Sequence, residues 1–277
     1  VLVLLGYSSS PWLRSPGARG FQTSWKRDPA APARGDDTEE LFIDGSHDGE
    51  DFCGEFPWIK PTRVVHSNLG SHGPDEGEEG IVWEARVVGR GAQDEMGRWV
   101  LLVVNATTTY SPSVARQNGL SGEFFSINIK SGSAVGLRMR VLDSETREVL
   151  QMPQLALTFF DLDHGHHKSS IEHVSAGGYH EFLLSHYTEV KRSRTVNGVM
   201  KFTASTYGNG EDNPKDGFHM TSQQMNRAIT LTYINVAEIL VEIGATAGLT
   251  PRFFTFVFRP ALVCTLSNDR NFMVQEE

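Results

Sequence analysis

Short apolar runs separated by turn-forming residues occupy the chain from Ile81 onward, and this rhythm constrains the fold most strongly. Residues 124–129 alternate between two faces, the period-two pattern of a β-strand. Asn197-Gly198 separates two further runs and is the dipeptide most typical of a tight β-hairpin. Asp143-Ser144-Glu145-Thr146 has the composition of another turn. Such a series of short strands and turns is typical of sandwiches and jelly rolls rather than of helical folds.

We therefore predict an all-β, antiparallel β-sandwich or jelly roll with about a dozen strands. The expected strands are Ile81–Val88, Trp99–Val104, Phe124–Ile129, Val135–Leu142, Glu148–Met152, Leu155–Leu162, Tyr179–Leu184, Thr188–Val196, Val199–Tyr207, Ile229–Ile234, Ile239–Ile243 and Phe253–Val263. One short helix is expected from Thr221 to about Ala228, because Thr221-Ser222-Gln223-Gln224 has the form of a capping box.

The sequence before Ile81 differs in composition from the rest. Residues 1–35 begin with an apolar run and contain no acid before Asp28, which predicts the remnant of a leader or a disordered segment. Residues 36–80 are rich in acids and predict an extended, solvated arm. The predicted division is leader 1–35, arm 36–80, β-sandwich 81–265 and tail 266–277.

Aromatic residues punctuate the acidic arm. Phe42, Phe52, Phe56 and Trp58 lie among the acids, and such side chains can occupy grooves on another protein. We expect these four residues to bind a protein partner within a larger assembly.

Charge, hydropathy and cysteine content restrict the class of protein. The net charge of −9 leaves no basic surplus to neutralise phosphates, so we expect no nucleic-acid partner. No apolar run approaches the ~20 residues of a transmembrane helix, so the expectation is a soluble protein or one held at a membrane by its partners. Cys53 and Cys264 could form one long-range disulfide but define no scaffold or zinc site.

The densest polar cluster follows the run Leu155–Leu162. Asp161, Asp163 and the nearby Glu172 offer oxygen ligands that suit calcium, although the full EF-hand pattern is absent. His164 and His166 could share one face and bind a transition metal instead, with His167 on the opposite face. A plain polar loop explains the same residues without any metal.

A second candidate is the loop 208–217, which is rich in Gly, Asn and Asp. It could order around calcium, or it could be a long turn, because turns need the same residues. A cation site shared by the two loops requires that they lie at the same end of the sandwich.

Signatures of the common enzyme classes are missing. The chain has no G-x-S-x-G, no H-E-x-x-H and no P-loop, and no G-x-G-x-x-G follows a strand into a helix. We expect a protein without catalytic activity.

Several stretches resemble a known class of module. The segments 157–163 (TFFDLD), 172–174 and 202–214 (ending GNGEDNP) resemble β-sandwich modules of algae, to which no defined activity is attached. The similarity covers roughly residues 120–263. Residues 1–27 resemble the bipartite leader of algae with complex plastids, which implies a plastid location. If the segment is instead a secretory signal, the protein is secreted.

Three functions remain open. The first is a non-catalytic interaction module, in its most concrete form an extrinsic subunit of a photosynthetic (thylakoid) membrane complex in a plastid. The second is a calcium-dependent carbohydrate- or surface-binding domain, which exposed aromatics such as Tyr179, Tyr187 and Tyr207 beside the loops would support. The third is a metalloenzyme that uses the His164–His167 cluster.

Overall fold

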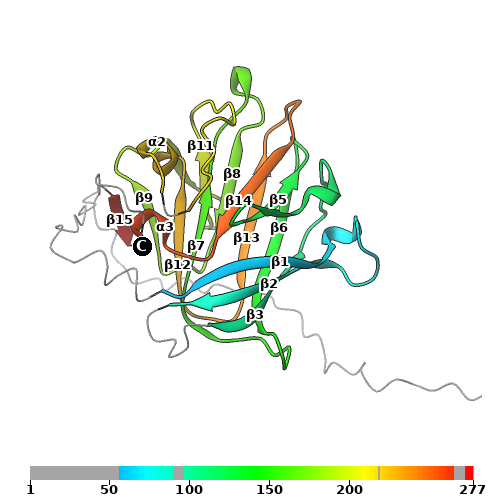
Figure 1. Cartoon of the computed structure of the whole chain (residues 1–277). Coiled ribbons are helices and arrows are strands. Elements are labelled where there is room, and N and C mark those ends of the chain that lie inside the picture. Colours follow the sequence, from blue (N-terminus) through cyan, green and yellow to red (C-terminus); the bar gives the residue numbers. More distant parts are fainter. Residues whose placement is uncertain (1–55, 90–96, 218, 265–271, 277) are drawn as a thin grey trace, which may run out of the picture. The chain divides into compact units, whose positions relative to one another are not determined.

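The computed structural model describes residues 56–89, 97–217 and 219–264, together with the backbone of Phe272–Glu276. In this part of the chain fifteen strands pair in antiparallel fashion and form two sheets (Figure 1). The two sheets pack as a sandwich, which confirms the predicted fold class. No helix among the described residues is long and apolar enough to cross a membrane.

The two sheets contain eight and seven strands. The first sheet has the order β1 (Trp58–Asn68), β2 (Gly80–Val88), β3 (Arg98–Ala106), β6 (Ala134–Asp143), β13 (Ile239–Ala245), β8 (Glu172–Ala176), β11 (Met200–Ala204) and β10 (Val190–Arg194). The second has the order β15 (Phe272–Glu276), β9 (Glu181–Ser185), β12 (Ile229–Val236), β7 (Met152–Phe160), β14 (Arg252–Val257), β5 (Phe124–Ile129) and β4 (Gly119–Ser121). Three short 3₁₀ helices lie in the connections: η1 (Leu69–Ser71), η2 (Ala115–Gln117) and η3 (His166–Lys168).

Aromatic side chains join the two sheets. Trp83 of β2 packs edge-on against Phe125 of β5, with ring centroids 5.2 Å apart, and against Phe256 of β14 at 6.4 Å. Its buried indole nitrogen donates a hydrogen bond to the Gly119 carbonyl at 2.9 Å. Aromatic pairs of this geometry add to the free energy already gained by burying the rings. The core therefore lies between the sheets around these aromatic rings.

The outer face of the second sheet is also covered. Helices α2 (Ser222–Asn226) and α3 (Ala261–Cys264) contribute Met225 and Leu262 to a separate apolar cluster with Phe124 and Phe160. The capping box predicted at Thr221 is present and opens α2. Every residue of β5 is buried, including those whose alternation suggested a polar side. Phe124 belongs to the helix-covered cluster, whereas the Asn128 side chain is hydrogen-bonded to Val114 and Asn118.

The first strand of the described residues begins at Trp58, well before the predicted boundary at Ile81. Strand β1 pairs with β2 along its length. Ile59 has no exposed surface, and its amide donates to the Phe258 carbonyl at 3.1 Å. Residues 58–80 therefore belong to the domain and not to an extended arm.

Two of the acids just before β2, Asp75 and Glu79, are bound by backbone groups, whereas Glu76 and Glu78 are exposed. The Asp75 carboxylate accepts from the Ser67 amide at 2.7 Å. The Glu79 carboxylate accepts from the amides of Gly70 at 2.8 Å and Ala106 at 3.0 Å. Charge-assisted bonds of this kind are stronger than neutral ones, so these acids anchor the β1–β2 connection.

The predicted partner-binding aromatics are only partly described. Phe56 is 7% exposed and is buried in the domain, so it does not present its ring to a partner. Trp58 is half-buried at the start of β1, with the Lys60 ammonium 5.0 Å from its ring. Phe42 and Phe52 lie outside the described residues, as does the predicted leader 1–35.

The C-terminal part also departs from expectation. Phe272–Glu276 forms β15 beside β9, so the predicted tail contributes a strand to the second sheet. The strand predicted to reach Val263 ends at Val257, and α3 follows. Cys264 is disulfide-bonded, and the chain's other cysteine, Cys53, lies outside the described residues.

The inclusion of β1 in the core makes a stability prediction. Ile59→Ala should lower the free energy of unfolding by about 2–5 kcal/mol, the usual effect of emptying a buried aliphatic position. Val65→Ala is the matched control, because Val65 is 42% exposed on the same strand. Urea unfolding monitored by tryptophan fluorescence measures both. Equal, small effects would mean that β1 does not belong to the core.

Candidate functional site

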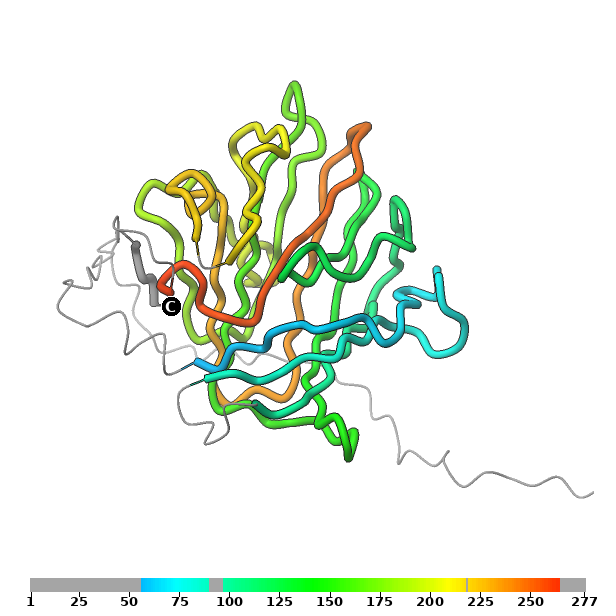
Figure 2. Tube along the Cα trace, in the orientation of Figure 1, coloured from blue at the N-terminus to red at the C-terminus, as the bar shows by residue number. Residues whose placement is uncertain are grey.

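Three loops meet at one end of the sandwich (Figure 2). They are the loop after β7 (161–171), the loop after β11 (205–221) and the loop between β13 and β14 (246–251). The His164 amide donates to the Thr206 carbonyl at 3.0 Å, and the Ser170 amide donates to the Ala247 carbonyl at 3.0 Å. The two loops that the sequence analysis singled out therefore lie side by side, and a third loop joins them.

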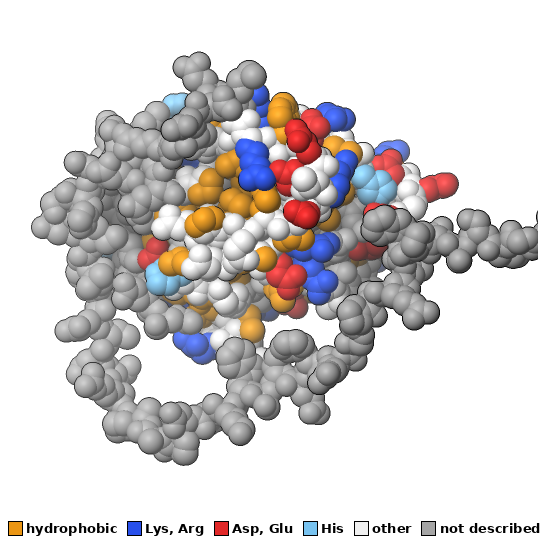
Figure 3. Space-filling model, turned by 90° about the horizontal axis from the view of Figure 1, so that it is seen from below, with side chains coloured by type: hydrophobic (Ala, Val, Ile, Leu, Met, Phe, Trp, Pro, Cys, Tyr) orange, Lys and Arg blue, Asp and Glu red, His pale blue; other side chains and the backbone are white. Residues whose placement is uncertain are grey.

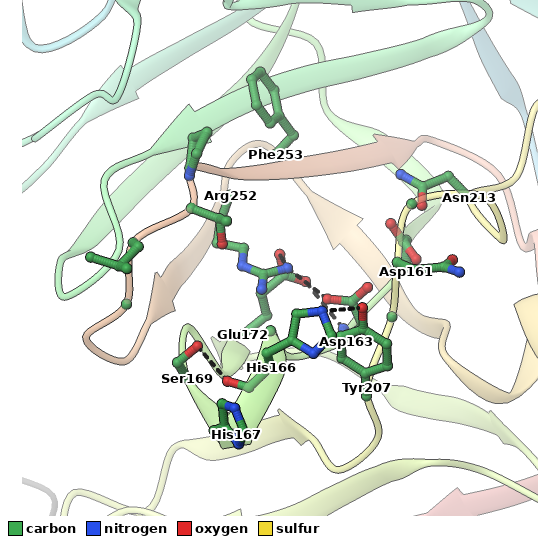
Figure 4. A pocket seen from close by; sticks show the side chains of 18 residues that line it. Asp161, Asp163, His166, His167, Ser169, Glu172, Tyr207, Asn213, Arg252 and Phe253 are labelled. Carbon is green, nitrogen blue, oxygen red and sulfur yellow. Dashed lines mark hydrogen bonds and ion pairs between the residues drawn. The ribbon is translucent and has the colours of Figure 1, made fainter.

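A pocket of about 660 Å³ lies between these loops (Figure 4). Volumes of about 300–1,000 Å³ are usual for small-molecule sites. The polar and aromatic side chains that line it include Asp161, Asp163, His166, Glu172, Tyr207, Asn213 and Arg252. The pocket is also lined by the apolar residues Leu249, Pro251 and Phe253.

The Arg252 guanidinium forms the centre of the pocket wall. Its Nη1 donates to Asp163 Oδ1 at 2.7 Å and lies 3.6 Å from Glu172 Oε1. Asp163 and Glu172 are each 3% exposed. Their backbones are also joined, because the Glu172 amide donates to the Asp163 carbonyl at 3.1 Å. Arg252 thus connects the start of β14 to the loop after β7 and to the start of β8.

Two glycines permit this close packing. A Cβ at Gly208 would lie 1.6 Å from Asp163 Oδ2, and one at Gly165 would lie 2.9 Å from Arg252 Nη2. Any side chain at Gly208 would therefore displace the Asp163 carboxylate. These glycines are needed for the close approach of neighbouring atoms.

Burial shifts the titration of the paired acids. It raises the pKa of Glu172 well above the ordinary value, and the Asp163 charge raises it further, while Arg252 acts in the opposite direction. Burial also raises the pKa of Asp163, which Arg252 again opposes. One guanidinium does not fully compensate two buried carboxylates.

Asp161 is the acid of this pocket that has no partner. No hydrogen bond or ion pair joins its half-buried carboxyl to another residue of the described ranges. Burial, together with the charges of Asp163 and Asp212, raises the pKa of Asp161 to about 8. At neutral pH the group is therefore largely protonated and can both donate and accept a hydrogen bond. Its backbone is left-handed (φ 57°), a conformation that Asp and Asn tolerate better than most residues.

An aromatic pair stands beside these polar groups. The rings of His166 and Tyr207 lie 4.5 Å apart at their centroids, inclined by 35°. The Tyr207 hydroxyl and His166 Nε2 are also hydrogen-bonded at 2.9 Å. Tyr207 remains 41% exposed, so part of its ring is available to a ligand.

The predicted metal ligands do not gather around one point. Asp161, Asp163, Glu172 and His166 all line the pocket, but Asp163 and Glu172 face Arg252. His164 is 8% exposed, and its Nδ1 lies 2.8 Å from the Gly165 carbonyl. Within the described ranges, no three His, Cys, Asp or Glu side chains are placed to hold a metal ion. The positive charge beside the buried carboxylates is thus a guanidinium of the chain itself.

A second arginine holds the loop after β11. Arg227 is 4% exposed; its Nε donates to Glu189 Oε2 at 2.7 Å and its Nη2 to the Tyr207 carbonyl at 2.8 Å. It also forms an ion pair with Asp212. This long loop is therefore anchored at both Tyr207 and Asp212.

Sequence reasoning located the acids but missed both arginines. Arg252 is 89 residues from Asp163, and nothing in the run Pro251-Arg252-Phe253 marks it as an ion-pair partner. Tyr207 was expected beside the loops and lines the pocket. Tyr179 packs against the core, and Tyr187 is 69% exposed but outside the pocket.

Comparisons with known proteins identify no family for the chain. No protein-family model and no curated protein sequence matches the chain. Among solved structures, the chain is similar to the N-terminal domain of the Streptococcus gordonii adhesin Sgo0707, with a TM-score of 0.40 and 10% sequence identity. The match covers 73% of this chain and 55% of that chain, so the chain spans about half the length of that domain.

The raised pKa of Asp161 predicts a pH-dependent stability. The folded state keeps a proton up to about pH 8 that the unfolded state releases near its ordinary pKa of 3.8. Rising pH between these values therefore destabilises the wild-type fold, by at most about 1.4 kcal/mol per pH unit. Asp161→Asn removes this contribution and keeps a residue that tolerates the left-handed backbone.

Urea unfolding at several pH values between about 5 and 8 measures the effect. The stability of Asp161→Asn relative to wild type should increase steadily with pH, while Asp163 and Glu172 titrate in both proteins. A difference that stays constant over this range would show that the Asp161 carboxyl is not held protonated.

Proposed function

We propose that this protein is a binding module for neutral carbohydrate and that the pocket between the three loops is its binding site. The observation that carries the proposal is the position of the unpartnered Asp161 carboxyl in the same pocket as the partly exposed Tyr207 ring. A sugar presents hydroxyl groups at its edge and C–H groups on its faces, so it requires both kinds of surface.

The polar side of the pocket suits vicinal hydroxyl groups. Asp161 and Asn213 both line the pocket, and neither side chain is hydrogen-bonded to another described residue. A protonated carboxyl and an amide each supply a donor and an acceptor. Neighbouring hydroxyls, which also donate and accept, can satisfy both groups in place of water.

The aromatic side suits the C–H face of a sugar ring. Tyr207 is held against His166 by ring contact and by its hydroxyl hydrogen bond. A ring fixed in this way loses little conformational freedom when a ligand packs on it. A tyrosine also combines an apolar face with a polar edge, which suits an amphipathic ligand.

The charge of the pocket favours a neutral ligand. Arg252 offsets part of the charge of Asp163 and Glu172, and Asp161 retains a proton at neutral pH. An anionic ligand would meet buried carboxylates without a free guanidinium to receive it. A neutral polyhydroxylated ligand meets no such repulsion.

The first of the three hypotheses stays a prediction. The face seen in Figure 3 has apolar side chains interspersed with basic and acidic ones. Singly exposed apolar residues, such as Trp99 at 42%, are usual on protein surfaces and do not by themselves mark an interface. The plastid location and the photosynthetic complex rest on the resemblance to algal modules and on residues 1–27, which lie outside the described part of the chain.

Substitution of Tyr207 tests the proposal. Isothermal titration calorimetry with glucose, galactose, mannose, maltose, lactose and cellobiose should detect binding of at least one sugar. Tyr207→Ala should weaken that binding by about tenfold, because the stacking surface is lost. Tyr187→Ala is the matched control, an exposed tyrosine outside the pocket, and should bind as wild type does. If no sugar binds, or if the two variants behave alike, the proposal is wrong.

A second prediction separates this proposal from calcium-dependent binding. Because Arg252 lies beside Asp163 and Glu172, we expect neither calcium nor EDTA to change the sugar affinity or the melting temperature. A ligand that binds only the native state must raise the melting temperature. A rise on adding millimolar calcium, reversed by EDTA, would therefore favour a calcium site.

A further inference from the structure

A second, smaller pocket adjoins the first. It has a volume of about 400 Å³ and is lined by Tyr207, Asn209, Glu211, Asp212 and Gln223. Tyr207 and Asn209 also line the larger pocket. The segment from Tyr207 to Asn209 therefore divides two neighbouring hollows.

The dividing segment is anchored by hydrogen bonds to neighbouring elements. The Gly208 amide donates to the His164 carbonyl at 3.2 Å, and Arg227 donates to the Tyr207 carbonyl at 2.8 Å. Beyond Asn209, the side-chain Nε2 of Gln224 donates to the Asp212 carbonyl at 2.9 Å. Arg227 and Gln224 belong to α2 and its C-terminal end, so a helix of the domain supports this wall.

The smaller pocket presents chiefly hydrogen-bond acceptors. Glu211 and Gln223 are exposed, and Asp212 is bound to Arg227. Asp212 Oδ1 is buried and has no hydrogen-bond partner among the described residues. Because this oxygen has no accessible surface, a ligand in the pocket meets instead the exposed side chains of Glu211 and Gln223, a carboxylate acceptor and an amide.

From this arrangement we infer that the site has two subsites, on either side of the Tyr207–Asn209 segment, and that it takes a neutral oligosaccharide rather than a single sugar. The inference rests on the proposed function. One sugar unit occupies the pocket of Asp161 and packs on Tyr207. The next unit lies beyond the shared wall and offers its hydroxyls to Glu211 and Gln223.

Ligand length is the property that tests this inference. Calorimetry on the full chain should compare a hexose that binds with its own disaccharide and trisaccharide, for example glucose, maltose and maltotriose. Two linked units bind more tightly than one because the second contact becomes intramolecular, and we expect a gain of about tenfold or more.

Variants of the smaller pocket test whether the increase in affinity with ligand length comes from that pocket. The double variant Glu211→Gln, Gln223→Ala should lose the gain with length and keep the affinity for the monosaccharide. Both residues are exposed and neither holds Arg227, so we expect the melting temperature to stay unchanged. Gln117→Ala, an exposed glutamine on η2 outside both pockets, is the matched control and should keep the gain.

The outcomes separate the two proposals. If no sugar binds at all, the proposed function fails and the inference fails with it. If the monosaccharide binds but longer ligands bind no more tightly, only the second subsite is refuted. The same holds if the double variant weakens all lengths equally.

Discussion

The burial of Asp163 and Glu172 around one guanidinium is the constraint on which the loop end of the sandwich depends. Each of the two residues is 3% exposed, and a buried charge without a partner is costly. Arg252 reduces that cost only when the start of β14, the loop after β7 and the start of β8 come together. Removal of Arg252 would leave two buried acids without a counter-charge. The three segments that carry these residues therefore fold together.

The pocket is a consequence of this cluster. With Asp163 and Glu172 facing Arg252, the third acid, Asp161, has no cation of its own and retains a proton. The loop after β11 lies close against Asp163 because Gly208 has no side chain, and this places Tyr207 beside His166. A neutral polar wall next to an aromatic ring follows from the way the buried charges are compensated, and this combination is what the carbohydrate proposal uses.

Local sequence patterns predicted the elements that are determined by residues close together in the sequence. The alternation of residues 124–129, the hairpin at Asn197-Gly198 and the capping box at Thr221 all have counterparts in β5, the β10–β11 pair and α2. They require only neighbours in sequence, so propensity and periodicity suffice. The clustering of Asp161, Asp163 and Glu172 in one loop region was visible for the same reason.

Elements that depend on distant partners were not predictable in this way. Strand β1 was missed because the acids that follow it suggested a solvated arm. The sequence does not show that Glu79 binds backbone amides. Strand β8 reads as polar, yet Glu172 is buried by a guanidinium far along the chain. The acids were interpreted as metal ligands because their counter-charge, Arg252, carries no local mark.

The central claim is that this pocket is the binding surface of the protein, and NMR tests it most directly. In ¹H–¹⁵N correlation spectra recorded during titration with maltotriose or cellotriose, the account predicts that the shifted amides cluster in residues 161–171, 207–213 and 246–253. Amide shifts that concentrate on another face, or spectra that stay unchanged at saturating oligosaccharide, would contradict it.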